Sequence, residues 1–427
     1  MEELPREADV VVVGAGALGS SVAFHLAARG DRRVVLIDKF AAASQTSPRA
    51  AGLTQQLRAT EPMAHLARRA CDLIESFQAD TGQPMEFHRS GSVKLARLPE
   101  HVEQLEAELE RAGRWGLRLG RLEPSELPKL SPFVRPDGVL FATHNPDDLY
   151  LEPGQIPRGY ARAAVDRGAS LVEHTPVRRL LLANDRVAGV ETPRGEIRAP
   201  LVVDAAGAWT RPIAETGGAR PALVPTRHQL LITQPLDGVR PEQPIVRVVD
   251  ANVYVRPERG GLMLGGYEDD PRQYDGASLG DGFQIADLEL DLGVLRRLAD
   301  RVVAQLPVFQ DVFARGLIRE HRGGLPTVTP DGRLLVGPLG AVPGLYVASG
   351  CNVGGLSTAP AIGEALAELI ALGRTRLDLS ELWPDRFGPE YGDQVRLRAA
   401  CQREYAYQYW TAKPTTSAPS ESPARPR

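Results

Sequence analysis

The stretch from residue 10 to residue 39, VVVVGAGALGSSVAFHLAARGDRRVVLIDK, constrains the fold more than any other part of the chain. It reads as a buried strand, a glycine-rich turn, an apolar-periodic helix and a second strand that ends at Asp38. In this order Gly14 permits a tight turn, Gly16 lets backbone approach a pyrophosphate, and Gly19 lets the helix press on the sheet. The motif predicts a βαβ unit that binds a dinucleotide, with the phosphates at the helix N-terminus.

Asp38 narrows the choice of dinucleotide. It follows Gly19 at close to the ~20-residue spacing expected of a carboxylate that accepts hydrogen bonds from ribose hydroxyls. An acid at this position disfavours the 2′-phosphate of NADP, which leaves NAD and FAD. The unit opens the chain, and no second complete fingerprint follows in the 427 residues. This placement indicates FAD, with the unit holding the adenosine half of the cofactor.

Composition limits the architecture and the partners. A chain of 427 residues is too long for one compact core and suits two interleaved domains. The net charge of −4 gives no basic surplus for nucleic acid or an anionic membrane. No apolar run approaches the ~20 residues of a membrane span, and the acidic N-terminus lacks a signal-peptide pattern. Three scattered cysteines (Cys71, Cys351 and Cys401) indicate neither disulfides nor a metal site, so a cytoplasmic protein is expected.

A second glycine-rich motif lies at residues 344–373. A strand runs into the sequence GCNVGG (350–355), and a helix is expected to start near Ser357 or Thr358, with Pro360 in its first turn. No ribose-binding acid follows this motif. Its helix N-terminus suits a group that becomes negative, such as the N1–C2=O edge of a reduced flavin. A tight strand-to-helix connection without a ligand is the alternative reading.

In the rest of the sequence the spacing of apolar residues changes along the chain. Helices are expected at 62–80, 100–113 and 286–306, and a turn at 146–154 leads into another helix. Residues 170–203 read as short strands separated by Asn-Asp and Arg-Gly turns, and a further antiparallel sheet is expected from the strands 223–233, 245–256 and 261–267. The segment 411–427 lacks aromatic residues and periodicity and is expected to be disordered.

Taken together, these motifs resemble those of the FAD-dependent amine and amino-acid oxidoreductases typified by D-amino-acid oxidase, glycine oxidase and sarcosine oxidase. Within that superfamily the likeness is strongest to the flavin portion of dimethylglycine and sarcosine dehydrogenases. The matching segments cover most of the chain: VVVGAGALGSSVAFHLA (11–27), SPRAAGLT (47–54), PDDLYLEPG (146–154), VVDAAGAW (202–209), YVRPERGGLMLGGYE (254–268), LPTVTPDGRLLVGP (325–338) and GLYVASGCNVGGLSTAPAIGE (344–364).

The resemblance implies a fold of mixed class, α/β together with α+β. A glutathione-reductase-like Rossmann domain that binds FAD would be interleaved with a substrate domain whose antiparallel sheet covers the flavin ring. The FAD-binding domain would comprise residues 1–84, 147–218 and 321–375, and the substrate domain residues 85–146 and 219–320. A helical extension would follow at 376–410, ahead of the disordered tail at 411–427.

The resemblance also assigns residues to the cofactor. These residues would form six parts of the site: the first glycine motif, the acid with its neighbour, the loop beneath the ring, the adenine contact, the pyrophosphate side and the pyrimidine edge. In chain order they are Gly14, Ala15, Gly16, Leu18, Gly19, Asp38, Lys39, Ser44, Ala51, Gly52, Leu53, Val177, Ala206, Gly207, Trp209, Gly350, Asn352, Gly354, Gly355 and Leu356.

Three departures from the family pattern bear on the chemistry. Arg49 stands where many dehydrogenases of this group attach FAD through a histidine, and Gly324 stands where monomeric sarcosine oxidases use a cysteine. Both departures imply non-covalent FAD. Met263 stands near the position of a lysine that assists oxidases in reducing O₂, which favours a dehydrogenase. The folate-binding half of those dehydrogenases has no counterpart in this sequence.

The implied activity is oxidation of the C–N bond of a small N-alkyl amino acid, by hydride transfer to flavin N5. Such a substrate needs guanidinium or phenol donors for its carboxylate; the candidates are Arg49, Arg58, Tyr254, Arg256 and Arg322. Tyr254 and Arg256 lie two apart on an expected strand and so share a face. A D-amino-acid or glycine oxidoreductase and a non-catalytic FAD-binding scaffold subunit are the alternatives. An electron-acceptor protein or a partner subunit is the expected macromolecular partner.

Overall fold

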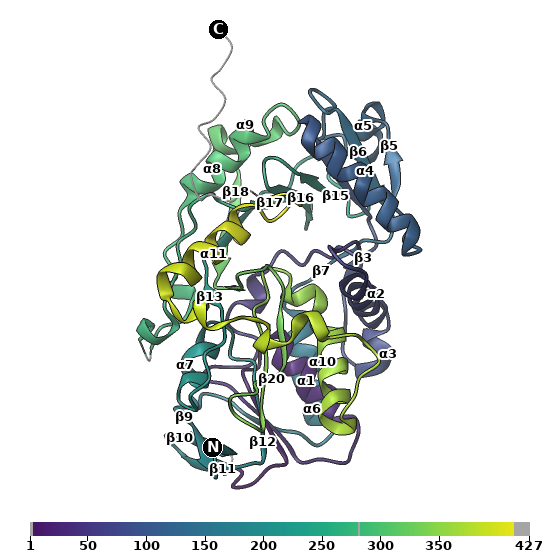
Figure 1. Ribbon diagram of the computed structural model, residues 1–427. Helices are drawn as coiled ribbons and strands as arrows, with labels where there is room; N and C mark the ends of the chain where they lie inside the picture. Colours follow the sequence, from purple (N-terminus) through teal and green to yellow (C-terminus); the bar gives the residue numbers. More distant parts are fainter. Residues whose placement is uncertain (1–2, 281, 414–427) are drawn as a thin grey trace.

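The computed structural model describes residues 3–280 and 282–413, which fold around two large sheets (Figure 1). The first sheet has six strands in the order β20-β21-β12-β1-β2-β8. Their bounds are Leu335–Pro338 (β20), Leu345–Ser349 (β21), Leu201–Asp204 (β12), Val10–Val13 (β1), Val34–Ile37 (β2) and Ser170–Val172 (β8). All neighbours are parallel except β20 and β21. The carboxyl ends of β1, β2, β12 and β21 therefore meet at one edge of the sheet.

Alternate residues of the first sheet enter two different cores, because successive side chains of a strand point to opposite faces. Val10 and Val12 pack against helices, whereas Val11 and Val13 pack against a small three-stranded sheet. Both faces are covered, which explains why β1 is a run of four buried valines. The small sheet has the order β11-β10-β9, with the bounds Gly195–Arg198 (β11), Arg186–Thr192 (β10) and Arg179–Ala183 (β9).

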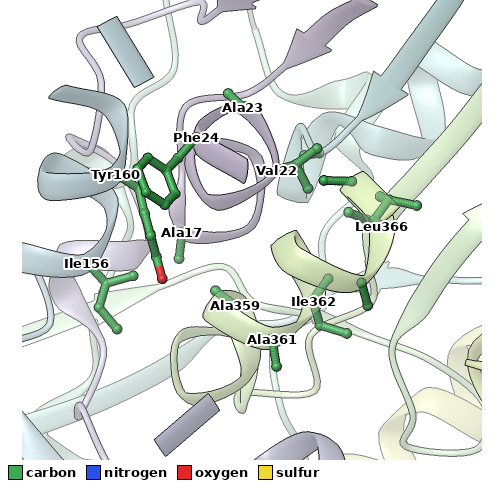
Figure 2. Close-up of a cluster of buried hydrophobic side chains, with 14 of the residues drawn as sticks. Ala17, Val22, Ala23, Phe24, Ile156, Tyr160, Ala359, Ala361, Ile362 and Leu366 are labelled. Carbon is green, nitrogen blue, oxygen red and sulfur yellow. The ribbon is translucent and has the colours of Figure 1, made fainter. Parts of the chain in front are cut away.

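The helical face is built from α1 (Ala17–Ala27), α6 (Gln155–Asp166) and α10 (Gly355–Leu372), with α2 (Glu61–Glu75) beside them. Figure 2 shows the contact between these helices: Phe24 of α1 lies against Tyr160 of α6, and the small side chains of α1 face those of α10. The Phe24 and Tyr160 ring centroids are 5.1 Å apart. Large aromatic side chains therefore fill the space between α1 and α6, whereas small residues let α1 and α10 approach closely.

Glycines set the close approach of α1 to its neighbours. A Cβ added at Gly19 would lie 1.9 Å from the Gly14 carbonyl oxygen, and one added at Gly363 would lie 2.1 Å from Ser21 Oγ. Gly14 adopts a φ of +100° and passes close to Ala205. The roles predicted for Gly14 in the turn and for Gly19 in helix-to-sheet packing are confirmed by this geometry.

The second sheet has eight strands in the order β18-β14-β17-β16-β15-β4-β6-β5. Their bounds are Ile318–Gly324 (β18), His228–Thr233 (β14), Gly261–Gly266 (β17), Val253–Glu258 (β16), Ile245–Val248 (β15), Ser92–Ala96 (β4), Phe141–Asn145 (β6) and Gly120–Leu122 (β5). The pairs are antiparallel, as expected, except that β4 and β15 run parallel. A parallel pair needs a long connection between its strands, which residues 97–244 supply.

Four helices accompany the second sheet: α4 (Pro99–Arg114), α5 (Leu127–Leu130), α8 (Leu292–Arg301) and α9 (Val308–Arg315). Two short helices, α3 (Phe77–Thr81) and α7 (Thr210–Glu215), and the longer α11 (Gln394–Ala406) lie elsewhere. Two-stranded sheets join β13 (Val224–Pro225) to β19 (Thr327–Val328) and β3 (Phe87–His88) to β7 (Tyr150–Leu151). Figure 1 shows α11, in yellow, between the upper part with β16 to β18 and the lower part with α1 and α10.

Some expectations were confirmed and others were wrong in detail. The Asn-Asp turn is present, with both Asn184 and Asp185 at positive φ, as a tight hairpin requires. The helix expected at 286–306 begins only at Leu292, because the Asp291 side chain caps it by accepting from Gly293 N at 2.8 Å. The helix expected at 62–80 is split at Ser76 into α2 and α3.

The start of α10 was also predicted wrongly. The helix begins at Gly355, so Pro360 lies in its second turn and not its first. The hydroxyls of Ser357 and Thr358 donate to the Gly354 carbonyl oxygen, which draws both residues into the first turn. At 18 residues α10 has the length and apolar composition of a membrane span, but 72% of it is buried inside the protein, as in a core helix. The predicted tail at 411–427 falls outside the described residues from 414 onwards.

Candidate active site

A cavity of about 700 Å³ opens at the carboxyl ends of the first sheet and extends beneath the second. Its volume lies in the range of small-molecule and cofactor sites, and its position at the strand ends is where open α/β sheets bind ligands. More than half of the predicted cofactor residues line it: Gly14, Gly16, Leu18, Asp38, Lys39, Ala51, Val177, Ala206, Gly207, Trp209, Gly355 and Leu356. Two sequence motifs more than 300 residues apart therefore meet at one cavity.

The other predicted cofactor residues stand behind that lining, namely Ala15, Gly19, Ser44, Gly52, Leu53, Gly350, Asn352 and Gly354. Their contacts support the loops that carry the lining. Asn352 Nδ2 donates to the Gly350 carbonyl oxygen at 2.6 Å, and Asn352 Oδ1 accepts from Thr329 N at 3.0 Å. A Cβ at Gly52 would lie 2.2 Å from the Leu151 carbonyl oxygen, so only glycine fits there.

The backbone at the N-terminus of α1 forms a cradle that faces the cavity. Gly16 occupies the N-cap position and has no side chain to cap the helix, and the first turn contains no acid. The Ser47 hydroxyl accepts from Ala17 N at 3.0 Å, which fixes the 44–53 loop beside the same turn. A helix N-terminus of this kind favours anions. The cradle therefore fits the pyrophosphate of a dinucleotide, for which a side chain at Gly16 would leave less room.

Asp38 directly follows β2 and lines the cavity. Its carboxylate accepts from Ala15 N at 2.6 Å and from Phe40 N at 2.7 Å. These two bonds hold the glycine turn to the end of β2 and leave further lone pairs for ribose hydroxyls. Burial raises the pKa of Asp38 to about 6. Beside it the Lys39 ammonium lies 5.1 Å from the Trp209 ring centroid.

Asp204 at the end of β12 is buried beneath the wall formed by Ala205 and Ala206. One carboxyl oxygen accepts from Ala206 N at 3.1 Å, and the other has no hydrogen-bond partner among the described residues. Burial raises the pKa of Asp204 to about 8. Asp204 is therefore mainly protonated at neutral pH and adds little negative charge beside the phosphate cradle.

The sequence analysis missed His228, whose side chain lines the cavity from β14. Its Nε2 lies 2.9 Å from the Tyr254 hydroxyl and its Nδ1 lies 2.8 Å from the Tyr405 hydroxyl. Burial lowers the pKa of His228 to about 4, so the ring is neutral at physiological pH. The signal in the sequence was a histidine at the start of the strand HQLLIT, which by itself indicates no partner.

Tyr254, predicted as a substrate contact, is placed beside this histidine by β16. Its cross-strand neighbour is Gly265, where an added Cβ would lie 2.2 Å from the Tyr254 hydroxyl oxygen. Glycine at this position therefore creates the space that the tyrosine occupies. Met263, which takes the place of the oxidase lysine, is fully buried in the same cluster of side chains.

Arg256 shares a face of β16 with Tyr254, but two of its three guanidinium nitrogens already have partners, and the buried Nη2 has none among the described residues. Arg256 forms a 2.5 Å ion pair with Glu258, and its Nε donates to the Ala51 carbonyl oxygen at 2.8 Å. It lines a separate cavity of about 240 Å³ and not the large one. The structure therefore places Arg256 behind the Ala51 loop, where its hydrogen bond supports a residue that does line the cofactor cavity.

Arg49 and Gly324 both line the large cavity, and Arg322 lies behind it. Arg49 Nη1 donates to the Ser44 carbonyl oxygen at 2.5 Å and also bonds the Gln45 carbonyl, which closes the 44–49 turn. Arg322 Nη2 donates to the Ala50 carbonyl oxygen at 3.2 Å and pairs with Glu320. Both arginines hold the loop through backbone carbonyls; Arg49 does so through Nη1 alone, and the buried Arg322 Nε has no hydrogen-bond partner among the described residues.

The Asp38 geometry predicts a pH-dependent affinity for FAD. Replacing Asp38 with Asn should weaken FAD binding about tenfold at pH 8, since a charge-assisted hydrogen bond is lost. Below about pH 5 the difference should vanish, because the wild-type carboxyl is then protonated as well. Titration of the apoprotein with FAD across this pH range measures both effects, with the exposed Asp31→Asn variant as control. Equal affinities at pH 8 would show that Asp38 does not recognise the ribose.

The cavity lining also predicts that FAD is held without a covalent bond. Arginine and glycine occupy the two attachment positions that the resemblance implies, and burial raises the pKa of the Cys351 thiol in the lining. Acid precipitation of the purified holoprotein should release all of the yellow colour into the supernatant. Flavin in the pellet of wild type but not of Cys351→Ser would show a thioether and contradict the prediction.

Comparison with known proteins shows the family to which the chain belongs. The chain is 30% identical over 391 residues to human mitochondrial dimethylglycine dehydrogenase, covering 89% of this chain and 44% of that protein. It is 31% identical over 401 residues to 4-methylaminobutanoate oxidase (formaldehyde-forming) of Paenarthrobacter nicotinovorans, covering 93% of this chain and 48% of that one. The chain thus spans a little under half the length of these relatives.

A solved structure extends the likeness to the whole fold. L-proline dehydrogenase from P. horikoshii superposes with a TM-score of 0.79 at 28% identity, covering 91% of this chain and all of that one. Residues 9–369 match the family of FAD-dependent oxidoreductases termed DAO, and this range includes both glycine motifs and all eight strands of the second sheet. The chain therefore belongs to the DAO family of FAD-dependent oxidoreductases.

Proposed function

We propose that this chain oxidises the C–N bond of a small N-alkyl amino acid, of the sarcosine or dimethylglycine type. The single observation that carries the proposal is Arg58, an enclosed guanidinium beside the cavity that has no carboxylate partner among the described residues. The names of relatives that act on dimethylglycine and 4-methylaminobutanoate support the same substrate class.

Arg58 lies directly behind the loop that closes the flavin end of the cavity. A Cβ added at Gly354 would lie 3.8 Å from Arg58 Nη1, and the neighbours Val353 and Gly355 both line the cavity. Its Nη2 makes one long hydrogen bond, 3.4 Å to Ser357 Oγ, and its Nε is buried without a partner. Burial lowers the pKa of Arg58, which records the cost of enclosing this charge. A ligand carboxylate would offset that cost.

The charged groups around Arg58 also leave one positive charge without a partner. Arg247 lies 3.8 Å from Asp148 and donates to the Thr54 carbonyl oxygen at 2.7 Å. Asp148 is held in turn by Gln56 N and by the Ser92 hydroxyl. Arg58 and Arg247 thus share one buried carboxylate, which leaves one positive charge uncompensated. A substrate with one carboxylate would complete the cluster, whereas an amine without one would not.

This charge also selects the protonation state of the substrate. An ammonium group brought into an enclosed site next to an uncompensated guanidinium is disfavoured by desolvation and by repulsion, so the amine enters neutral. A neutral amine has the lone pair that assists departure of hydride from the adjacent carbon. The C–H electron pair leaves as hydride, the nitrogen lone pair forms the C=N bond of an iminium ion, and water hydrolyses this ion to a carbonyl and a smaller amine with release of a proton. No acid from the protein is required in the hydride step.

FAD, when bound, supplies the hydride acceptor at N5. The protein's own contribution is to hold the substrate and to stabilise the charge that develops. Tyr254 lies 2.9 Å from His228, which lines the cavity, so a phenol is held next to the cavity wall. The N-terminus of α10, at Gly355, faces the cavity with its positive dipole end.

The proposed reaction predicts anaerobic bleaching of the flavin by the right class of substrate. N-methylglycine or N,N-dimethylglycine should bleach the bound FAD in a stopped-flow screen, and matched amines without a carboxylate should not. Peroxide should form slowly in air, because Met263 replaces the oxidase lysine, so electrons would leave to another acceptor. Bleaching by glycine or D-amino acids alone would favour the alternative activity, and inertness to every amine and amino acid would contradict an enzymatic role.

The Arg58 assignment predicts a selective loss of substrate affinity. Arg58→Gln should raise the half-saturating substrate concentration by about tenfold or more, because a desolvated charge-assisted contact contributes roughly 1.5–3 kcal/mol. FAD content should stay unchanged. The exposed Arg162→Gln variant is the matched control. The Arg322→Gln variant, measured alongside, decides between the two arginines. If it raises the half-saturating substrate concentration more than Arg58→Gln does, Arg322 is the residue that contacts the carboxylate.

A further inference from the structure

A buried carboxylate, Asp148, connects the segment that carries Arg58 to the second sheet. It lies shortly after β6 and is 1% exposed. Its Oδ1 accepts from Gln56 N at 2.8 Å, two residues before Arg58 in the chain. Its Oδ2 accepts from the hydroxyl of Ser92, at the start of β4, at 2.6 Å. Neutral donors therefore hold the carboxylate in place and leave its negative charge to act on the guanidinium groups nearby.

Two arginines interact with this one carboxylate. Arg247 of β15 is 3% exposed, and its Nη1 lies 3.8 Å from Asp148 Oδ2 without a hydrogen-bond partner among the described residues. Burial lowers the pKa of Arg58, the Asp148 carboxylate partly offsets this effect, and the Arg247 guanidinium lowers the pKa further. Both arginines are thus attracted to Asp148 and repel each other. We call these three groups the charge cluster.

The other titratable groups that act on the charge cluster are neutral at physiological pH. Burial raises the pKa of the Cys71 thiol to about 12 and raises the pKa of Tyr267 well above its ordinary value. It also raises the pKa of Tyr409, which interacts with the arginine of β15, and lowers the pKa of His144, which interacts with the carboxylate. The charge cluster, with two guanidinium groups and one carboxylate, therefore has one net positive charge.

We propose that Asp148 and Arg247 are positioning residues that set the charge of the carboxylate site without contacting the ligand. Asp148 neutralises Arg247, so the positive charge of Arg58 is left for the anion. A ligand with one carboxylate makes the cluster neutral, whereas a second carboxylate would leave a buried negative charge uncompensated. The contact between Arg58 and the ligand rests on the proposed function, so the test uses a carboxylate that cannot be oxidised.

Acetate is that probe, because it has a carboxylate and no C–N bond. Its affinity for the FAD-loaded protein is measured from the change in flavin absorbance. Asp148→Asn should tighten acetate binding about tenfold, because two positive charges then act on the ligand. Arg247→Gln should weaken binding about tenfold, because Asp148 then neutralises Arg58. Asp148→Asn keeps the shape of the side chain and an oxygen acceptor for Gln56 N.

The variant that carries both changes separates charge from structure. Arg58 again supplies one net positive charge, so acetate affinity should return to within about threefold of wild type. Two merely structural losses would add up instead. Affinity as low as in Arg247→Gln would show that Arg247 contacts the ligand itself, and affinity as high as in Asp148→Asn would show that the charge of Arg247 has no influence. Either result would overturn the proposal.

Arg247→Lys keeps the charge and should bind acetate nearly as wild type does. It decides the question with Asp148→Asn if Arg247→Gln does not retain FAD. Asp147→Asn is the matched control for the adjacent position. Its carboxylate pairs with Arg89 at 3.3 Å, outside the charge cluster, so its loss should leave acetate affinity unchanged. Acetamide, the neutral isostere of acetate, should bind every variant equally weakly.

The outcomes separate this proposal from the proposed function. If no amine or amino acid bleaches the wild-type flavin, the oxidation of N-alkyl amino acids fails, while acetate titration still decides the charge balance. If acetate binds equally well to wild type and Arg58→Gln, or does not bind to wild type, the charge balance fails, whatever the protein oxidises.

Discussion

The close approach of helix α1 to its surroundings is the constraint on which the rest of this structure depends. Its N-terminus can face a diphosphate only if Gly14 turns tightly past Ala205 and Gly19 lies against the Gly14 carbonyl. Gly363 then lets α10 reach Ser21 on the other side. Because α10 begins at the second glycine motif, this packing also places the flavin end of the cavity. A methyl group at any of these glycines would move one wall of the site against another.

The other half of the site is shaped by buried charged groups, some of which have an oppositely charged partner and some of which do not. Most buried arginines are paired: Arg256 has Glu258 and Arg247 has Asp148. Arg58 is not, and Asp204 is held mainly neutral by its raised pKa of about 8. Because Arg58 is a cation without a partner and Asp204 is an acid that stays mainly protonated, this part of the site carries a positive charge. Such a region suits an anionic cofactor and a carboxylate substrate, and it disfavours a protonated amine.

Local sequence signals predicted the parts of the molecule that depend on neighbouring residues. The first βαβ unit, the hairpin at Asn184 and strands in three segments of the second sheet follow from glycine positions and alternation, and are present. The segment 245–256 holds parts of two strands, β15 and β16, where one was expected, and β4, β5, β6 and β18 were not predicted. Helix ends were less certain, since Asp291 capping and the Gly354 carbonyl contacts moved the starts of α8 and α10. His228 and Tyr405 could not be paired from the sequence, because 177 residues separate them and nothing in either local pattern refers to the other. The orientation of Arg256 could not be predicted for the same reason. Its partner Glu258 follows it by two residues, but the orientation of Arg256 depends on the Ala51 loop.

The order of strands in both sheets has a consequence for synthesis of the protein. The first sheet needs β1 from the start of the chain and β21, which is complete only at Ser349, and the second pairs β4 with β15 across about 150 residues. Neither sheet can close until most of the polypeptide has left the ribosome, and α11 arrives last of all. Contacts so distant in sequence form slowly and leave apolar strand edges exposed while they wait. The nascent chain should thus depend on chaperones more than a protein of similar size whose domains are contiguous.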